Sequence, residues 1–251
     1  MMRPRDGIWR LAGGLCLLGV WHLMAHRGGS LAFASPWETF QAGVNLLSDT
    51  SFWAHSLLPS LNRILAGFFL GSVLGCILGG CAGIFPALGF FLLPFRWIFS
   101  SVPGVILVIL AMLWCSSDTS LVVLIVMITV IPTIYVAVQE GIAAIDRDLC
   151  EMVRVYNASL SKKLFALYLP AIAAQLLSAG IVALGGGMRV AILGETLGTS
   201  QGLGYALAVA RTNLDTAQLY AVALISMLLV SMIEATCLRY LRGQLQREER
   251  T

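Results

Sequence analysis

Two ionisable residues lie inside one apolar segment of the chain, GGGMRVAILGE, which covers residues 185–195. A charge in such surroundings is costly, so it indicates a binding or transport role by default. At 100° per residue, Arg189 and Glu195 point about 240° apart on a regular helix, so we do not expect them to pair with each other. Arg189 either binds an anion, for which the preceding glycines leave room, or pairs with a carboxylate elsewhere, such as Glu234.

The sequence contains no motif for catalysis or for nucleotide binding. GxxxxGK[ST], the loop that holds nucleotide phosphates, is absent, and so are HExxH and GxSxG. The three histidines are isolated, and no CxxC occurs among the six cysteines, which indicates neither a zinc site nor a disulfide framework. We therefore expect neither an enzyme nor a cofactor or metal bound to this chain. Any energy-driven role of this chain must therefore draw on another subunit or on an ion gradient.

The composition places the chain in the lipid bilayer. Of its 251 residues 58% are hydrophobic and only 12% are charged, with a mean hydropathy of +0.86. Average soluble domains are about 25% charged. The net charge of +3 comes from short basic clusters beside apolar segments, so it does not indicate a nucleic-acid partner. The predicted class is an all-α polytopic membrane protein.

The longest polar island between two apolar segments covers residues 140–170. Asp146 or Asp148 can cap a short helix that runs to Val155, with the acidic groups in its positively polarised first turn. Leu169 precedes a proline and marks a bend, because the residue before proline is pushed out of the α region. A short helix held between two membrane spans is a shape that a partner protein can grip.

The same island resembles the EAA loop of ABC-importer permeases, whose pattern is roughly E-A-A, three residues, G-A-S, and L-P ten residues later. The resemblance is carried by Glu151-Met152-Val153, Asn157-Ala158-Ser159 and Leu169-Pro170. The spacing matches throughout, although Met152-Val153 replaces Ala-Ala and Asn157 replaces Gly. Asparagine is the next-best residue for a left-handed position, so the turn is retained.

In that family the loop forms a coupling helix that sits in a cleft of the ATP-hydrolysing subunit. The resemblance implies that this loop contacts the ATPase through Asp148, Glu151, Met152, Arg154, Val155, Asn157, Ala158 and Ser159. It also implies the type I permease fold with a second copy of the permease. Two cytoplasmic ATPase subunits would carry the ATP and Mg²⁺, and an external substrate-binding protein would deliver the solute.

A second resemblance lies in ETLGTSQGLGY, residues 195–205, a glycine-rich stretch that cannot be one continuous helix. It is similar to the external loop of the nitrate/sulfonate/taurine-type branch of these permeases, where an E-x-L-G segment precedes GLGY or GIGY. The following residues 210–217, ARTNLDTA, are also similar to that branch. The resemblance covers about residues 52–240 and implies a small anionic solute such as a sulfonate or nitrate.

Apolar segments predict six transmembrane helices, at residues 11–25, 64–85, 88–114, 121–138, 171–193 and 219–238. We favour a retained first span, but a signal peptide cleaved after Ala34 is the alternative. The second span has a glycine at every fourth residue from Gly67 to Gly83, which suits tight packing within one subunit or a sliding or dimer surface. The third is interrupted by Arg96 and Pro103-Gly104, which indicates a kink or a path-lining segment.

The distribution of lysine and arginine predicts the orientation. With an internal N-terminus, the inner segments hold eleven of the sixteen basic residues: three in residues 1–10, four in 140–170 and four in the tail. The outer segments hold three, Arg27, Arg63 and Arg211. We therefore expect both termini and the 140–170 loop in the cytoplasm, and the resemblance implies the inner membrane of a bacterial cell. Six spans agree with this arrangement.

Together these observations predict the transmembrane permease subunit of an ATP-driven importer. Residues 1–51 would form the first span and an external linker, 52–240 the permease core with five spans, and 241–251 a cytoplasmic tail. The candidate path residues are Pro103, Arg189 and Glu195. The alternatives are an ion-gradient-driven transporter or channel, which predicts carboxylates at mid-membrane depth, and a scaffold protein, which needs no cytoplasmic loop.

Overall fold

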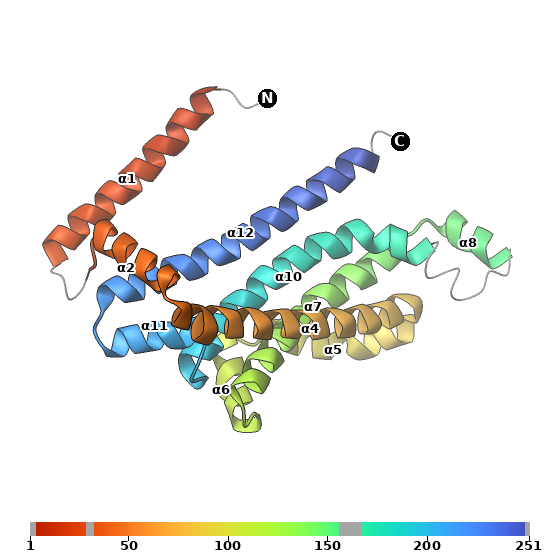
Figure 1. The fold of residues 1–251 in the computed structure, drawn as a ribbon. Coiled ribbons are helices and arrows are strands. Elements are labelled where there is room, and N and C mark those ends of the chain that lie inside the picture. Colours follow the sequence, from red (N-terminus) through yellow and green to blue (C-terminus); the bar gives the residue numbers. More distant parts are fainter. Residues whose placement is uncertain (1–3, 29–32, 156–166, 249–251) are drawn as a thin grey trace.

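The computed structural model describes residues 4–28, 33–155 and 167–248, and every regular element in these ranges is a helix (Figure 1). A predicted all-α fold is therefore confirmed. The elements are α1 (Pro4–Gly28), α2 (Pro36–Ser48), α3 (Thr50–Phe52), a π-helical turn (Trp53–Leu57), α4 (Leu58–Ile84), α5 (Pro86–Ser101), α6 (Gly104–Trp114), α7 (Asp118–Ala143), α8 (Arg147–Val155), α10 (Leu169–Gly198), α11 (Leu203–Thr212) and α12 (Thr216–Glu248).

Four helical stretches in the described ranges are long and apolar enough to cross a membrane: Thr50–Ile84, Asp118–Ala143, Leu169–Gly198 and Thr216–Thr236. The pair α5 and α6 gives a fifth if it counts as one span. Residues 11–25, the first predicted span, lie within α1, a helix of 25 residues. The sequence predicts six spans, and the structure supports four or five of them; the span at residues 11–25 stays a prediction.

The central contact of the fold is made by the glycine stripe of α4 against α7. All five glycines from Gly67 to Gly83 face α7, so that a side chain at any of them would collide with it. A Cβ atom at Gly75, for example, would lie 2.8 Å from the Cβ atom of Ile134. Small residues allow two membrane helices to approach this closely. Of the two interpretations of the stripe, packing within one subunit is confirmed.

α7 also packs against α10, and much of the buried core of the bundle lies at this contact. Val122, Ile125 and Val126 of α7 are completely buried. Gly187 of α10 faces Val126, where an added Cβ atom would lie 3.1 Å from the Cγ1 atom of that valine. α7 is thus enclosed by α4 and α10, which holds these three spans in one unit.

The third predicted span is divided at the proline–glycine pair. Val102 ends α5 with an extended backbone (ψ 120°), as expected for a residue before proline. Pro103 stands at the cap position of α6, and Gly104 is the first residue of that helix. The axes of α5 and α6 differ by 102°, so the break is far sharper than a kink within one helix. The pair is either a broken span or a re-entrant segment.

The predicted external linker contains α2, which the sequence analysis does not anticipate. The Ser35 hydroxyl accepts a bond from the Glu38 backbone N–H at 3.2 Å, and the Glu38 carboxylate accepts one from the Ser35 N–H at 2.8 Å. This reciprocal cap starts the helix at Pro36. The indole N–H of Trp21 in α1 donates to the Ala34 carbonyl at 3.0 Å, which ties α1 to the start of α2.

Candidate functional site

The short helix α8 lies at one end of the bundle, beyond the end of α7 and before the start of α10 (Figure 1). Its first turn is capped by Asp146, whose Oδ1 atom accepts a bond from the backbone N–H of Asp148 at 3.1 Å. The described part of the helix covers Arg147–Val155, so the predicted short helix within the 140–170 loop is confirmed with its cap. The predicted bend at Leu169 is wrong: Leu169 and Pro170 are the first two residues of α10, and Tyr168 before them also has helical backbone angles (φ −71°, ψ −48°). Proline fits here because the first turn of a helix needs no N–H donor from it.

One face of α8 is apolar and open to the surroundings. Leu149, Met152 and Val155 follow one another at intervals of three residues, so they lie on the same side of the helix. Their exposed fractions are 45%, 51% and 79%. Glu151 is also exposed, beside this face. Exposed apolar side chains grouped on a helix indicate a contact with another protein.

Part of the predicted contact set lies outside the described residues, namely Asn157, Ala158 and Ser159. Arg154 belongs to α8 by its backbone. The remaining members, Asp148, Glu151, Met152 and Val155, are brought together on one nine-residue helix. No observation here tests their contact with an ATPase, which stays a prediction.

Arg189 of α10 is paired with Glu234 of α12. The Nη2 atom of the arginine lies 3.0 Å from Oε1 of the glutamate, and the two side chains are 63% and 30% exposed. The two helices meet here because Gly185 has no side chain: an added Cβ atom would collide with the Glu234 carboxylate. The predicted ion pair with Glu234 is present, and Arg189 and Glu195 do not pair, as expected.

Glu195 has a different role from the one the sequence suggests. Its side chain is completely buried and bound on several sides. Oε2 accepts bonds from the Ser60 hydroxyl at 2.6 Å and from the Gly204 backbone N–H at 3.1 Å, while Oε1 lies 3.3 Å from Nη1 of Arg63. The structure therefore does not support the prediction that Glu195 lines a path. The residue joins α4, α10 and α11.

Arg63 is predicted to lie in an external segment, and this prediction is wrong. Arg63 lies within α4, is only 6% exposed, and also donates to the Gln201 carbonyl at 2.9 Å. A signal for its burial was available. Arg63 precedes Gly67 by four residues, so it extends the register of the glycine stripe that faces the core.

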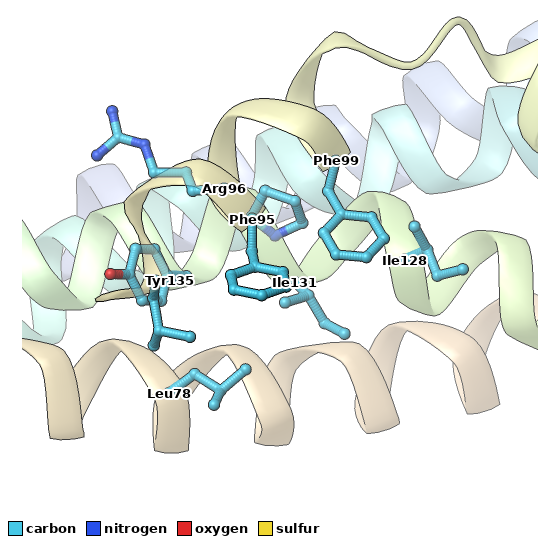
Figure 2. A pocket seen from close by; sticks show the side chains of 9 residues that line it. Leu78, Phe95, Arg96, Phe99, Ile128, Ile131 and Tyr135 are labelled. Carbon is cyan, nitrogen blue, oxygen red and sulfur yellow. The ribbon is translucent and has the colours of Figure 1, made fainter. Parts of the chain in front are cut away.

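An apolar cavity of about 240 Å³ lies between α4, α5 and α7 (Figure 2). Its labelled lining includes Phe95, Phe99 and Ile131, while the guanidinium of Arg96 points away from these rings. A second cavity of about 260 Å³ lies at the break between α5 and α6, beside Gly104 and Val190. Pro103 shapes this break and is therefore close to the second cavity, although its role in a path stays a prediction.

Comparison with known families decides what kind of protein carries these features. A family model described as "Binding-protein-dependent transport system inner membrane component" matches residues 71–247, which include α7, α8 and α10. The chain belongs to this family. It is the membrane component of a transport system, a permease and not an enzyme, and the predicted resemblance to ABC-importer permeases is confirmed.

Similar proteins carry names from the branch that the sequence resembles. The permease is 25% identical over 214 residues to a Bacillus subtilis protein named as an aliphatic sulfonates transport permease, SsuC, covering 85% of this chain and 74% of that protein. It is 28% identical over 220 residues to the Escherichia coli SsuC, covering 83% and 79%. It is 22% identical over 192 residues to the Escherichia coli taurine transport system permease TauC, covering 75% and 70%.

Solved structures of the MetNI methionine ABC transporter in inward-facing conformations share the fold of the permease. One has a TM-score of 0.62 at 18% identity and covers 75% of this chain and 94% of the other. A second has a TM-score of 0.61, also at 18% identity, and covers 82% and 96%. At this identity the likeness extends to the fold, which confirms the type I permease architecture.

Proposed function

We propose that this permease moves a small anionic solute, such as a sulfonate, into the cytoplasm, and that ATP hydrolysed on a separate subunit drives the movement. An external binding protein delivers the solute, and two copies of the permease enclose the path in the bacterial inner membrane. ATP and Mg²⁺ are bound by the partner subunits. The solute class rests on the names of the sulfonate and taurine permeases to which the chain is similar.

The observation that carries the proposal is α8. A capped helix stands between two long spans with Leu149, Met152 and Val155 exposed on one face and Glu151 beside it. The apolar face supplies buried contact area and the charged flank supplies orientation, which suits a cleft in a soluble partner. When the ATPase subunits close, α8 moves with them and acts as a lever on α7 and α10. Because α7 packs against both α4 and α10, these spans move together.

The orientation belongs to the same proposal. α8 must lie in the cytoplasm to meet an ATPase, and the excess of lysine and arginine in its loop and near both termini supports that side. α12 runs from the end of the molecule that carries α11 toward the end that carries α8 (Figure 1). The C-terminus is therefore cytoplasmic as well. The external end carries α2 and α11, where the binding protein docks.

The proposal is tested with the complete transporter in proteoliposomes, using taurine as the probe solute. We expect ATP-dependent uptake with the wild type and a fall of about tenfold or more for Glu151→Lys, because a reversed charge at a protein contact is repelled. Glu140→Lys makes the same charge change on an exposed residue of α7 and is the matched control. Uptake that needs no ATPase, or that is unchanged in Glu151→Lys, would contradict the proposal.

A further inference from the structure

The ion pair between Arg189 and Glu234 is unusual in its exposure. Both residues lie in candidate spans, Leu169–Gly198 and Thr216–Thr236, yet the arginine side chain is 63% exposed. A charged group in a span is costly against lipid and is found where it faces a water-filled path or another protein segment. This face of α10 and α12 is therefore turned toward a water-filled path or another protein segment and not toward the lipid.

Each of the three glycines before Arg189 has a distinct neighbour. Gly185 faces the Glu234 carboxylate, and Gly187 faces Val126 of α7. Gly186 has no neighbour within 4 Å of the position that a Cβ atom would occupy. An open strip of backbone therefore lies one turn before Arg189, on the same face of α10.

The arginine side chain points toward the turn that holds Gly185 and Gly186, because side chains on a helix lean toward its N-terminus. Its guanidinium binds the Glu234 carboxylate that adjoins Gly185, while the space beside Gly186 stays open. A guanidinium offers five N–H donors in a planar fork that suits oxyanions. Within the described residues, the guanidinium donates one hydrogen bond, from Nη2 to one carboxylate oxygen of Glu234. The remaining donors can meet a second anion above Gly186.

We propose that Arg189 is the anion-binding residue of the translocation path and that Glu234 is its counter-ion while the path is empty. The solute presents a sulfonate or a similar oxyanion above Gly186 and displaces the Glu234 carboxylate from the guanidinium. An exposed ion pair contributes little net stability, so the exchange is readily reversible. This inference rests on the proposed function in taking the solute to be an anion.

A purely structural ion pair between α10 and α12 makes a different prediction. If the pair only braced the two helices, removing either charge would have the same effect. If Glu234 competes with the solute for Arg189, removing the arginine abolishes binding, whereas removing the glutamate strengthens it. Glu234→Gln keeps the size of the side chain beside Gly185, so the packing of the two helices is retained.

The test is calorimetric titration of the full-length permease in lipid nanodiscs with ethanesulfonate, without ATPase or binding protein. Relative to the wild type, we expect Glu234→Gln to bind about two- to fivefold more tightly. This factor corresponds to the free energy that an exposed ion pair contributes. We expect no measurable binding by Arg189→Gln, and none by Gly186→Leu, which fills the open strip. Gly80→Leu is the matched control, because Gly80 of α4 also has no neighbour within 4 Å of a Cβ position.

Weaker binding by Glu234→Gln, or wild-type binding by Arg189→Gln, would overturn the anion site. Absence of binding in all variants, Glu234→Gln included, would overturn it equally. Thermal unfolding of each variant confirms that the fold is kept. The titration contains no ATP, so its outcome is separate from that of the uptake experiment. If the variants show the expected order of affinities but uptake does not depend on ATP, the anion site is retained and the proposed energy source is rejected.

Discussion

Arg63 and Glu195 form a buried ion pair between two helices, although they are 132 residues apart in the chain. Arg63 also holds the Gln201 carbonyl, and Ser60 binds both Glu195 and the backbone N–H of Leu203. The network joins the start of α4, the end of α10 and the start of α11. The end of the bundle opposite α8 is thereby held as one unit.

Removal of Glu195 is expected to destabilise the permease strongly. Glu195→Ala leaves the Arg63 charge buried without its partner, a change that costs about 3–5 kcal/mol. The thermal unfolding midpoint of the purified protein should fall accordingly. Glu140→Ala, at an exposed position of α7, is the control, and we expect about 0.5 kcal/mol or less for it. Equal midpoints for the two variants would show that the buried network contributes no stability.

A double variant separates the charge from the packing. Arg63→Met combined with Glu195→Leu replaces both ionic groups with apolar side chains of similar volume, and such replacements are often neutral. We expect the double variant to unfold at a higher temperature than Glu195→Ala alone. A double variant that is less stable than the single one would indicate that the network acts through its hydrogen bonds to Ser60 and Gly204 and not through the charge pair.

The contact between α4 and α7 predicts which glycines tolerate a side chain. In Gly75→Val the new Cβ atom on α4 would lie 2.8 Å from the Cβ atom of Ile134 on α7, so the two helices must move apart. Overpacking of this kind costs about 1–3 kcal/mol of stability. Gly80→Val is the control on the same helix, since its Cβ atom meets nothing within 4 Å. Thermal unfolding of the two variants should separate them clearly. A stable Gly75→Val protein would mean that the two helices are further apart than described.

Gly202 is held in a conformation that suits glycine. Its φ angle is +118°, and a Cβ atom there would collide with the Glu195 carboxylate. Gly202→Ala should therefore destabilise the turn by about 1–3 kcal/mol through backbone strain, with an additional cost from the displaced carboxylate. Gly104→Ala serves as the comparison, because its nearest neighbour would lie 3.5 Å away. We expect the unfolding midpoint to fall for the first variant and to stay near that of the wild type for the second.

The sequence predicts α8 and the glycine stripe well, because each depends on neighbouring residues. The cap of α8 needs only Asp146 and the N–H two residues later, and the stripe follows from a fourfold spacing on one helix. The pairing of Arg189 with Glu234 was also accessible, because few carboxylates in apolar segments can neutralise that arginine. In each case the type and spacing of a few residues leave few structural options.

Other features depend on tertiary contacts that spacing does not reveal. Arg63 precedes the apolar run of the second predicted span, so the sequence places it in a loop. In the structure α4 starts at Leu58, five residues before Arg63. Proline and glycine at 103–104 predict an interruption, but not the 102° bend between α5 and α6. Glu195 lies at the edge of an apolar segment, and only the fold brings Ser60 and Arg63 to it. Burial of these residues is decided by elements more than a hundred residues away.

Contact between α8 and the ATPase is tested most directly by photo-cross-linking from Met152. A photoreactive phenylalanine derivative replaces Met152, which is 51% exposed on α8, in the permease co-expressed with its ATPase and binding protein. The control carries the same group in place of Trp37 of α2, which is 65% exposed at the other end of the molecule. We predict a covalent permease–ATPase product from position 152 and none from position 37. An assembled complex that gives no product from position 152, or gives one from position 37, would contradict the role of α8 and its cytoplasmic location.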